Sequence, residues 1–92
     1  SAGSIAPIKK FLEVCDESIS TPIAIVIHSG SDIERDYANI FGHVIKNYRL
    51  KIVEDETKIE EKHVYFPKIG HHLIVDGDVL VSTRGPEVNS FR

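Results

Sequence analysis

The chain has 92 residues, which limits it to one domain with a small hydrophobic core. With 41% hydrophobic and 27% charged residues, and no apolar run near the roughly 18 residues of a membrane span, it is neither disordered, fibrous nor membrane-inserted, and we expect a cytoplasmic protein. A net charge of −3 provides no basic surface for a nucleic-acid backbone, so no nucleic-acid partner is expected.

The first predicted element is an amphipathic helix over residues 5–15, where apolar side chains recur at helical spacing. The polar stretch over residues 16–22 ends at a Thr-Pro pair and predicts a loop. The single cysteine, Cys15, excludes an intrachain disulfide and a multi-thiolate zinc site. We expect it to be an inert core thiol, because it lies in helical register with Ile8, Phe11 and Leu12.

A buried strand and a second helix follow in the chain. Residues 23–27 are five consecutive apolar residues rich in β-branched side chains, and predict a strand that is buried on both faces. Ser31 and Asp32 are candidate caps of the second helix. Its predicted apolar stripe consists of Ile33, Tyr37, Ile40, Phe41, Val44 and Ile45.

The second half of the chain is predicted to be rich in strands. Residues 50–53 and 63–66 are strand candidates, the latter ended by Pro67, and the charged stretch over residues 54–62 is interpreted as a solvated connection. Two apolar runs flank Asp76-Gly77-Asp78, which predicts a β-hairpin over residues 73–81 because Asp-Gly favours tight reverse turns. We therefore predict an α/β fold: a partial doubly wound, mainly parallel sheet with flanking helices and a β-hairpin near the C-terminus.

Two segments could supply chemistry. Ser1 begins a small-residue turn before the first helix, where free backbone N–H groups can hold an anion beside a nucleophilic hydroxyl. His28 follows the predicted buried strand, and functional groups gather at the carboxyl ends of parallel strands. Serine and histidine together make the nucleophile and base pair that hydrolases use.

At these residues the chain resembles the catalytic domain of the bacterial chemotaxis protein-glutamate methylesterases. The opening S-A-G-S-I-A-P-I matches the family's nucleophile turn, and the strand ending at His28 matches its apolar strand ending in Q-H-M. Residues 65–72 loosely match a Y-I-A-P-G-G-x-H motif, and residues 86–92 match P-P-V-N-x-H-R-P-S. The four matches occur in the family's order and cover the whole chain.

Carried over by position, the resemblance implies that Ser1 is the nucleophile and His28 the base. It implies scaffold or cleft roles for Gly70, His72, Val88, Asn89 and Arg92. The family's catalytic aspartate lies well beyond the matched motifs, so we expect residues 1–92 to be a single, incomplete domain that is nearly inactive alone. An incomplete domain leaves sheet edges and apolar helix faces uncovered, so we also expect poor solubility or dimerisation.

The implied reaction is hydrolysis of glutamyl γ-methyl esters on the cytoplasmic helices of chemoreceptors, and some relatives also deamidate glutamine. The resemblance implies no cofactor, and it is compatible with a receiver or methyltransferase domain in the parent protein. The alternative function is a non-catalytic adaptor that retains the esterase fold. A less favoured alternative is that Ser1 uses its own α-amino group as the base. Metal binding is not expected, because the neighbours His71 and His72 would point to opposite faces of a strand.

Overall fold

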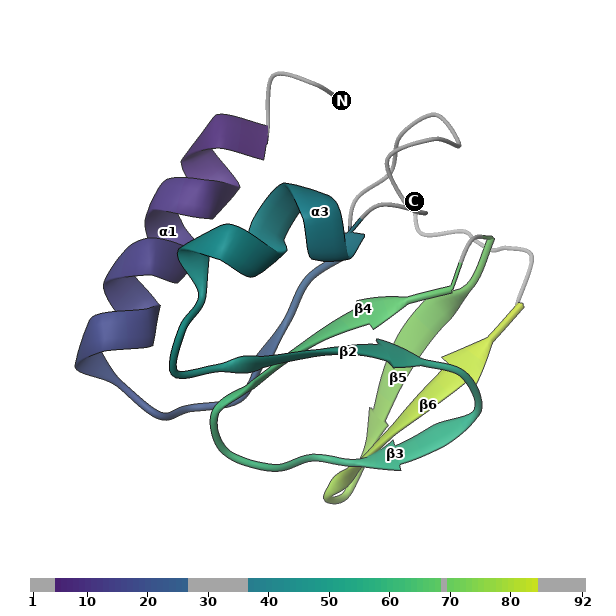
Figure 1. Ribbon diagram of the computed structural model, residues 1–92. Helices are drawn as coiled ribbons and strands as arrows, with labels where there is room; N and C mark the ends of the chain where they lie inside the picture. The colour runs from purple at the N-terminus through teal and green to yellow at the C-terminus, as the bar shows by residue number, and fades with distance from the viewer. Residues whose placement is uncertain (1–4, 27–36, 69, 85–92) are drawn as a thin grey trace.

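The computed structural model describes residues 5–26, 37–68 and 70–84, and it confirms the predicted α/β fold. A parallel three-stranded sheet lies at the centre (Figure 1). Helices cover one of its faces, and a small antiparallel sheet packs toward the other. Among the described helices, none is long and apolar enough to cross a membrane.

Helix α1 spans Ile5–Ser18 and extends past the predicted end at Cys15. Leu12 and Cys15 are buried, which confirms the core position of the thiol. The prediction for Phe11 is wrong, because its side chain is 54% exposed on the outer surface of the helix. Leu12 and Ile8 already fill the stripe that faces the sheet, and Phe11 lies about 100° away from Leu12 around the helix.

The parallel sheet has the strand order β1-β4-β2, with β1 at Ile23–Ala24, β4 at His63–Pro67 and β2 at Arg49–Val53. Strand β4 is central and its Val64, Tyr65 and Phe66 are buried, as expected for a parallel strand covered on both faces. Strand β4 extends one residue past its predicted end and includes Pro67 as its last residue. At the end of a strand, the missing N–H of proline interrupts little of the hydrogen-bond ladder.

The prediction that the strand from Ile23 is buried on both faces is wrong for its described residues. Ile23 and Ile25 pack against the helix-side core, whereas Ala24 is exposed and Val26 is 43% exposed. Strand β1 is an edge strand in the described sheet, and the small antiparallel sheet does not extend over its second face.

The predicted second helix is confirmed where it is described: α3 spans Tyr37–Phe41 and continues as the 3₁₀ turn η2, Gly42–Val44. Ser31, Asp32 and Ile33 lie outside the described residues. The ring of Phe66 stacks on that of Tyr37 at 4.1 Å and on that of Phe41 at 5.4 Å between ring centroids. These three rings, each at most 1% exposed, form the centre of the main core.

The antiparallel sheet has the order β3-β6-β5, with β3 at Glu56–Lys58, β6 at Val79–Thr83 and β5 at His72–Asp76. The β5–β6 hairpin is confirmed, and Gly77 has φ 67 in its two-residue turn. A positive φ at the first central residue is typical of a type II′ turn, which favours glycine. Strand β3 lies inside residues 54–62, the stretch interpreted from the sequence as a solvated connection. That interpretation is wrong for Glu56–Lys58, because these residues pair with β6 despite their charges.

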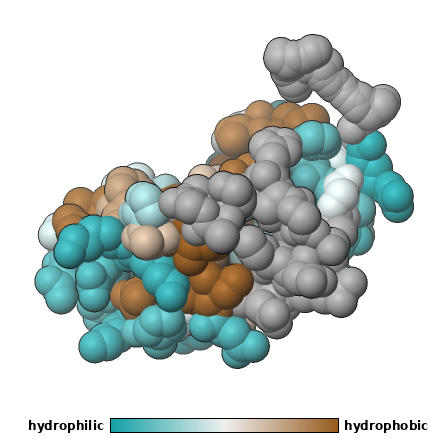
Figure 2. Space-filling model, turned by 90° about the horizontal axis from the view of Figure 1, so that it is seen from above, coloured by the Kyte–Doolittle hydropathy of each residue, from teal (hydrophilic) through white to brown (hydrophobic). Residues whose placement is uncertain are grey.

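Apolar patches interrupt the hydrophilic surface when the molecule is seen from the helix side (Figure 2). On α1 the exposed large hydrophobic residues are Phe11 and Val14, the latter 58% exposed. On β5 they are Ile74 and Val75, which are 51% and 67% exposed. Large side chains are therefore uncovered on two separate elements.

Candidate functional site

The carboxyl ends of three parallel strands define one edge of the central sheet. Strands β1 and β2 both pair with β4 in parallel, so all three end on the same side. The N–H of Ile25 donates to the carbonyl of Tyr65 at 2.9 Å, which carries the pairing of β1 toward Val26. Ligand sites of open α/β sheets lie at such an edge.

The orientation of α1 follows from where its last turn is held. Asp16, in that turn, accepts hydrogen bonds from the residues that precede β2, and the carbonyl of Ser20 accepts one from the N–H of Lys62, just before β4, at 2.8 Å. The C-terminal end of α1 thus lies beside the starts of the strands (Figure 1). From that end, the 14 residues of α1 run back along the sheet for about 21 Å (Figure 1). The first turn, at Ile5, is therefore directed toward the carboxyl edge.

The two predicted catalytic residues, Ser1 and His28, lie outside the described residues. In the sequence, Ser1 comes four positions before the start of α1 and His28 two positions after Val26. The structure therefore describes the two elements that flank these residues, and their catalytic roles stay predictions. Ile27, Val88, Asn89 and Arg92 also lie outside the described residues.

Two of the residues assigned to the cleft by resemblance are described. Gly70 has φ 75, a conformation that favours glycine, in the connection between β4 and β5. His72 begins β5 and pairs with Thr83. The N–H of His71 donates to the carbonyl of Lys68 at 3.0 Å, so a tight turn leads away from the carboxyl edge of β4. Gly70 thus fits a scaffold role for this turn.

Asp16 is the main buried polar group among the described residues, at 3% exposed. Its Oδ1 accepts hydrogen bonds from the backbone N–H groups of Lys46, Asn47 and Tyr48 at 3.0, 2.8 and 2.9 Å. The side-chain amide of Asn47 also donates to its Oδ2 at 3.3 Å and to its backbone carbonyl at 3.0 Å. Burial by itself raises the pKa of Asp16, but these hydrogen bonds outweigh it and hold the pKa below 3.8. The ionised carboxylate thus clamps the end of α1 to the segment before β2.

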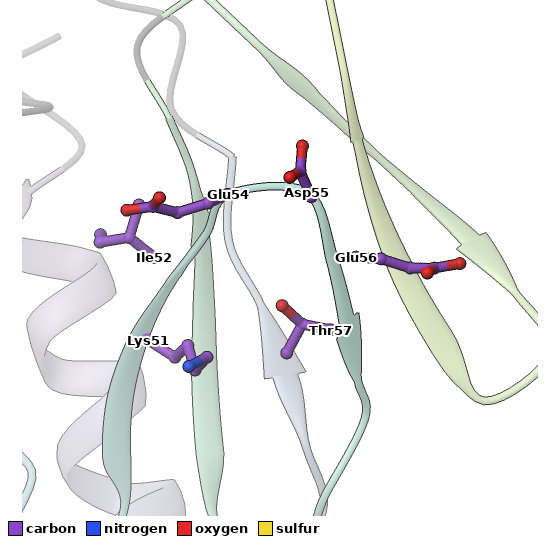
Figure 3. Close-up of a pocket in the computed structure, with 6 residues that line it drawn as sticks. All are labelled: Lys51, Ile52, Glu54, Asp55, Glu56 and Thr57. Carbon is purple, nitrogen blue, oxygen red and sulfur yellow. The ribbon is translucent and has the colours of Figure 1, made fainter.

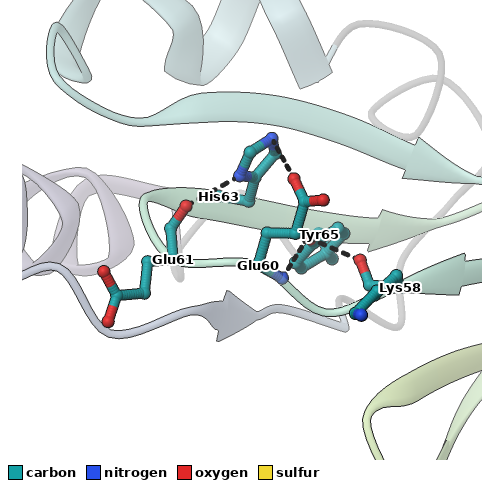
Figure 4. Close-up of polar contacts among 5 residues, drawn as sticks. All are labelled: Lys58, Glu60, Glu61, His63 and Tyr65. Carbon is teal, nitrogen blue, oxygen red and sulfur yellow. Dashed lines mark hydrogen bonds and ion pairs between the residues drawn. The ribbon is translucent and has the colours of Figure 1, made fainter.

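A second polar group lies at the opposite edge from the candidate site, where β4 begins (Figure 4). The hydroxyl of Tyr65 donates to the carbonyl of Lys58 at 3.1 Å and accepts from the N–H of Glu60 at 2.9 Å. His63 contacts the carbonyl of Glu61 through Nδ1 at 2.9 Å, and its Nε2 lies 3.9 Å from Glu60 Oε1. These contacts hold the loop between β3 and β4. The described partners of His63 are Glu60, Glu61 and Tyr65, none of which is a serine, threonine or cysteine.

An open pocket of about 350 Å³ lies between β2 and β3 (Figure 3). Its lining consists of Lys51, Ile52, Glu54, Asp55, Glu56 and Thr57. The carboxylates of Glu54, Asp55 and Glu56 point in different directions (Figure 3), and no histidine lines the space, so Thr57 has no imidazole base there. Within residues 5–26, 37–68 and 70–84, no group of three or more His, Cys, Asp or Glu side chains could hold a metal ion.

Sequence reasoning missed the roles of Asp16 and Tyr65. A signal existed for Asp16: a carboxylate in the last turn of a helix opposes the helix dipole, so it requires a partner from elsewhere in the fold. Nothing in the sequence marks Lys46–Tyr48 as that partner, because the three N–H groups converge only through the backbone conformation. Tyr65 had no signal beyond a buried strand position.

Comparison with known families gives one finding: the family model described as CheB methylesterase matches residues 1–92, the whole chain. No curated protein and no solved structure matches it.

Proposed function

Because the chain belongs to the CheB methylesterase family, which acts in chemoreceptor demethylation during chemotaxis, we propose that Ser1 and His28 supply its nucleophile and its base. The observation that carries the proposal is the match of the family model over residues 1–92, a range that includes both positions. The substrate class is the glutamyl γ-methyl ester of methylated chemoreceptor helices, and glutamine deamidation is a related reaction of the same site.

The arrangement of the described elements supports this assignment. The first turn of α1 and the end of β1 are directed to the same edge of the sheet, and the two residues flank them in the sequence. Serine before a helix and histidine after a neighbouring parallel strand is a layout that allows the two side chains to meet. No cofactor is needed for this chemistry.

The proposed reaction has two steps. Ser1 Oγ attacks the γ-carbonyl carbon while His28 takes the hydroxyl proton, and the resulting oxyanion is held by backbone N–H groups at the start of the helix. Collapse of this intermediate breaks the bond to the methoxy oxygen, which leaves as methanol with the proton from His28. Water, deprotonated by His28, then hydrolyses the acyl-enzyme and restores the glutamate carboxylate and the free serine.

The test measures methanol release from methylated receptor membranes by the protein in its full encoded length. We expect Ser1→Ala and His28→Gln each to lower the rate by at least about a thousandfold, as loss of either member does in such pairs. Ser18→Ala and His43→Gln are matched controls, because they change the same residue types at exposed positions outside the proposed site and are expected to retain activity within about twofold.

The outcomes separate the alternatives. Receptor demethylation that survives both Ser1→Ala and His28→Gln would contradict the catalytic assignment. A wild-type protein that binds the receptor but has no esterase activity would favour the non-catalytic adaptor. Loss of activity in Ser1→Ala with full activity in His28→Gln would favour the α-amino group of Ser1 as the base.

We further propose that the protein acts in the cytoplasm, where the receptor helices are, and that the parent protein carries a receiver or methyltransferase domain. Pull-down of the parent protein with receptor cytoplasmic fragments, methylated and unmethylated, tests the substrate proposal. Equal recovery of the two fragments by the Ser1→Ala variant would argue that the methyl ester itself is not recognised.

A further inference from the structure

The two described sheets have four edge strands: β1, β2, β3 and β5. These edge strands differ in how well their side chains and length protect them against pairing with a strand of another molecule. Strand β3 carries the charged Glu56 and Lys58, and β2 carries Arg49 and Lys51, all exposed. Charged side chains of this kind discourage edge pairing, and β1 is only two residues long. Strand β5 differs, because it is five residues long and exposes Ile74 and Val75.

Alternate residues of β5 have backbone N–H and C=O groups that point away from β6. The N–H of Ser82 donates to the carbonyl of Asp55 at 2.7 Å, on the β3 side of β6, so it does not bond Leu73, its partner in register. Pairs alternate along an antiparallel ladder, and Leu73 and Val75 are therefore the residues whose N–H and C=O groups point outward from the sheet. Among the described strands, β5 has β6 as its one neighbour.

This edge is complementary to itself. In an antiparallel pair of two copies of β5 centred on Ile74, Leu73 lies opposite Val75 of the second copy, and both have outward backbone groups. The two strands would exchange four backbone hydrogen bonds through these residues. The imidazole of His72 lies opposite the carboxylate of Asp76, so no like charges face each other.

The side chains agree with the same register. Ile74 meets its own symmetry mate in a non-hydrogen-bonded pair, where side chains approach most closely. On the other face, Leu73 packs at the margin of the core formed by Val53, Tyr65 and Leu80, and Val75 of the second copy extends that surface. Pairing would thus cover both aliphatic side chains that β5 exposes.

We propose that the β5 edge is a homodimerisation surface, at which two copies of the chain pair around Ile74 to form a continuous six-stranded antiparallel sheet. The partner is a second copy of the chain, because the register, the hydrogen-bond pattern and the charges all match under a two-fold axis. One strand pair buries less area than stable dimers do, so the dissociation constant should be on the order of 10 μM or weaker. The surface does not involve Ser1 or His28.

Sedimentation velocity of the full encoded protein, from well below to well above that concentration, tests the proposal. We expect a reversible monomer–dimer equilibrium whose dissociation constant rises at least about tenfold in Ile74→Lys and in Ile74→Glu, because each places like charges opposite each other. An equimolar mixture of the two variants should dimerise again, since lysine then faces glutamate. Rescue by mixing is specific to a register in which residue 74 faces itself.

Two further variants keep the result interpretable. Val75→Pro removes an outward N–H without removing a bond to β6, and it should also weaken the dimer. Val14→Lys, at a site on α1 that is 58% exposed against 51% for Ile74, is the matched control and should leave the dimer unchanged. A wild-type protein that is monomeric throughout, a dimer lost in Val14→Lys instead of Ile74→Lys, or charge variants that stay monomeric on mixing would overturn the proposal.

Discussion

The two described sheets of this protein differ in how many of their faces are covered. The parallel sheet is covered by α1 and α3 on one face, and its central strand contributes Val64 and Phe66, both 0% exposed, to an aromatic core. The antiparallel sheet buries one face against a small cluster and leaves Ile74 half-exposed on the other. Parallel strands need cover on both faces, whereas antiparallel strands tolerate water on one.

The difference indicates a division of labour. The parallel sheet and the clamp at Asp16 fix the direction of α1, whose first turn is directed toward the carboxyl edge of that sheet. The antiparallel sheet has the smaller core and carries an unprotected edge. We therefore expect rigidity in the first region and surface function in the second.

The largest expected effect lies in the aromatic core. Phe66→Ala removes the ring that stacks on both Tyr37 and Phe41, and leaves a cavity between the helix layer and the sheet. We expect the free energy of unfolding to fall by about 4 kcal/mol. Urea denaturation followed by circular dichroism measures this loss.

The matched variant in the other region is Val75→Ala, at a side chain that is 67% exposed. Measured at a concentration where the protein is monomeric, it should cost less than about 0.5 kcal/mol. Equal losses from the two variants would contradict the proposed contrast between the sheets.

The second prediction concerns the clamp. Asp16→Ala leaves the N–H groups of Lys46, Asn47 and Tyr48 without their acceptor in a largely buried site, and should lower the free energy of unfolding by about 3 kcal/mol. Asp16→Asn keeps one acceptor oxygen but no charge, and should cost about half as much. A loss as small as that of Val75→Ala would show that α1 is held mainly by its apolar stripe.

The same carboxylate gives a pH dependence with a definite sign. The folded pKa of Asp16 is lowered relative to the unfolded chain, so its ionised form contributes stability above pH 3.8. That contribution declines as the pH falls below 3.8 through the folded pKa. Between neutral pH and this acid range, the stability difference between wild type and Asp16→Asn should shrink, as measured by urea denaturation at each pH.

Much of this fold could be predicted from local patterns, because strands, a helical stripe and a glycine turn leave periodic signals. The stripe of Tyr37 and Phe41 and the hairpin at Gly77 are examples. What could not be predicted depends on tertiary context. Strand β3 forms only because β6 pairs with it, and Asp16 finds its partners 30 to 32 positions along the chain. The described residues show where the elements flanking Ser1 and His28 in the sequence lie, whereas the roles of these two residues stay predictions.

The last prediction compares one glycine from each region, Gly77 in the hairpin and Gly42 in the helix layer. Neither Gly77 nor Gly42 has any atom within 4 Å of an added Cβ, so space does not distinguish them. Gly77 has φ 67 and Gly42 does not have a positive φ, so Gly77→Ala should cost about 1 kcal/mol while Gly42→Ala should be neutral or slightly stabilising. If the hairpin opens as a separate unit, hydrogen exchange will show faster exchange for Gly77→Ala in β5 and β6 alone. Exchange that is equally faster in β4 would mean instead that the two sheets unfold together, and that the contrast in burial is not a contrast in cooperativity.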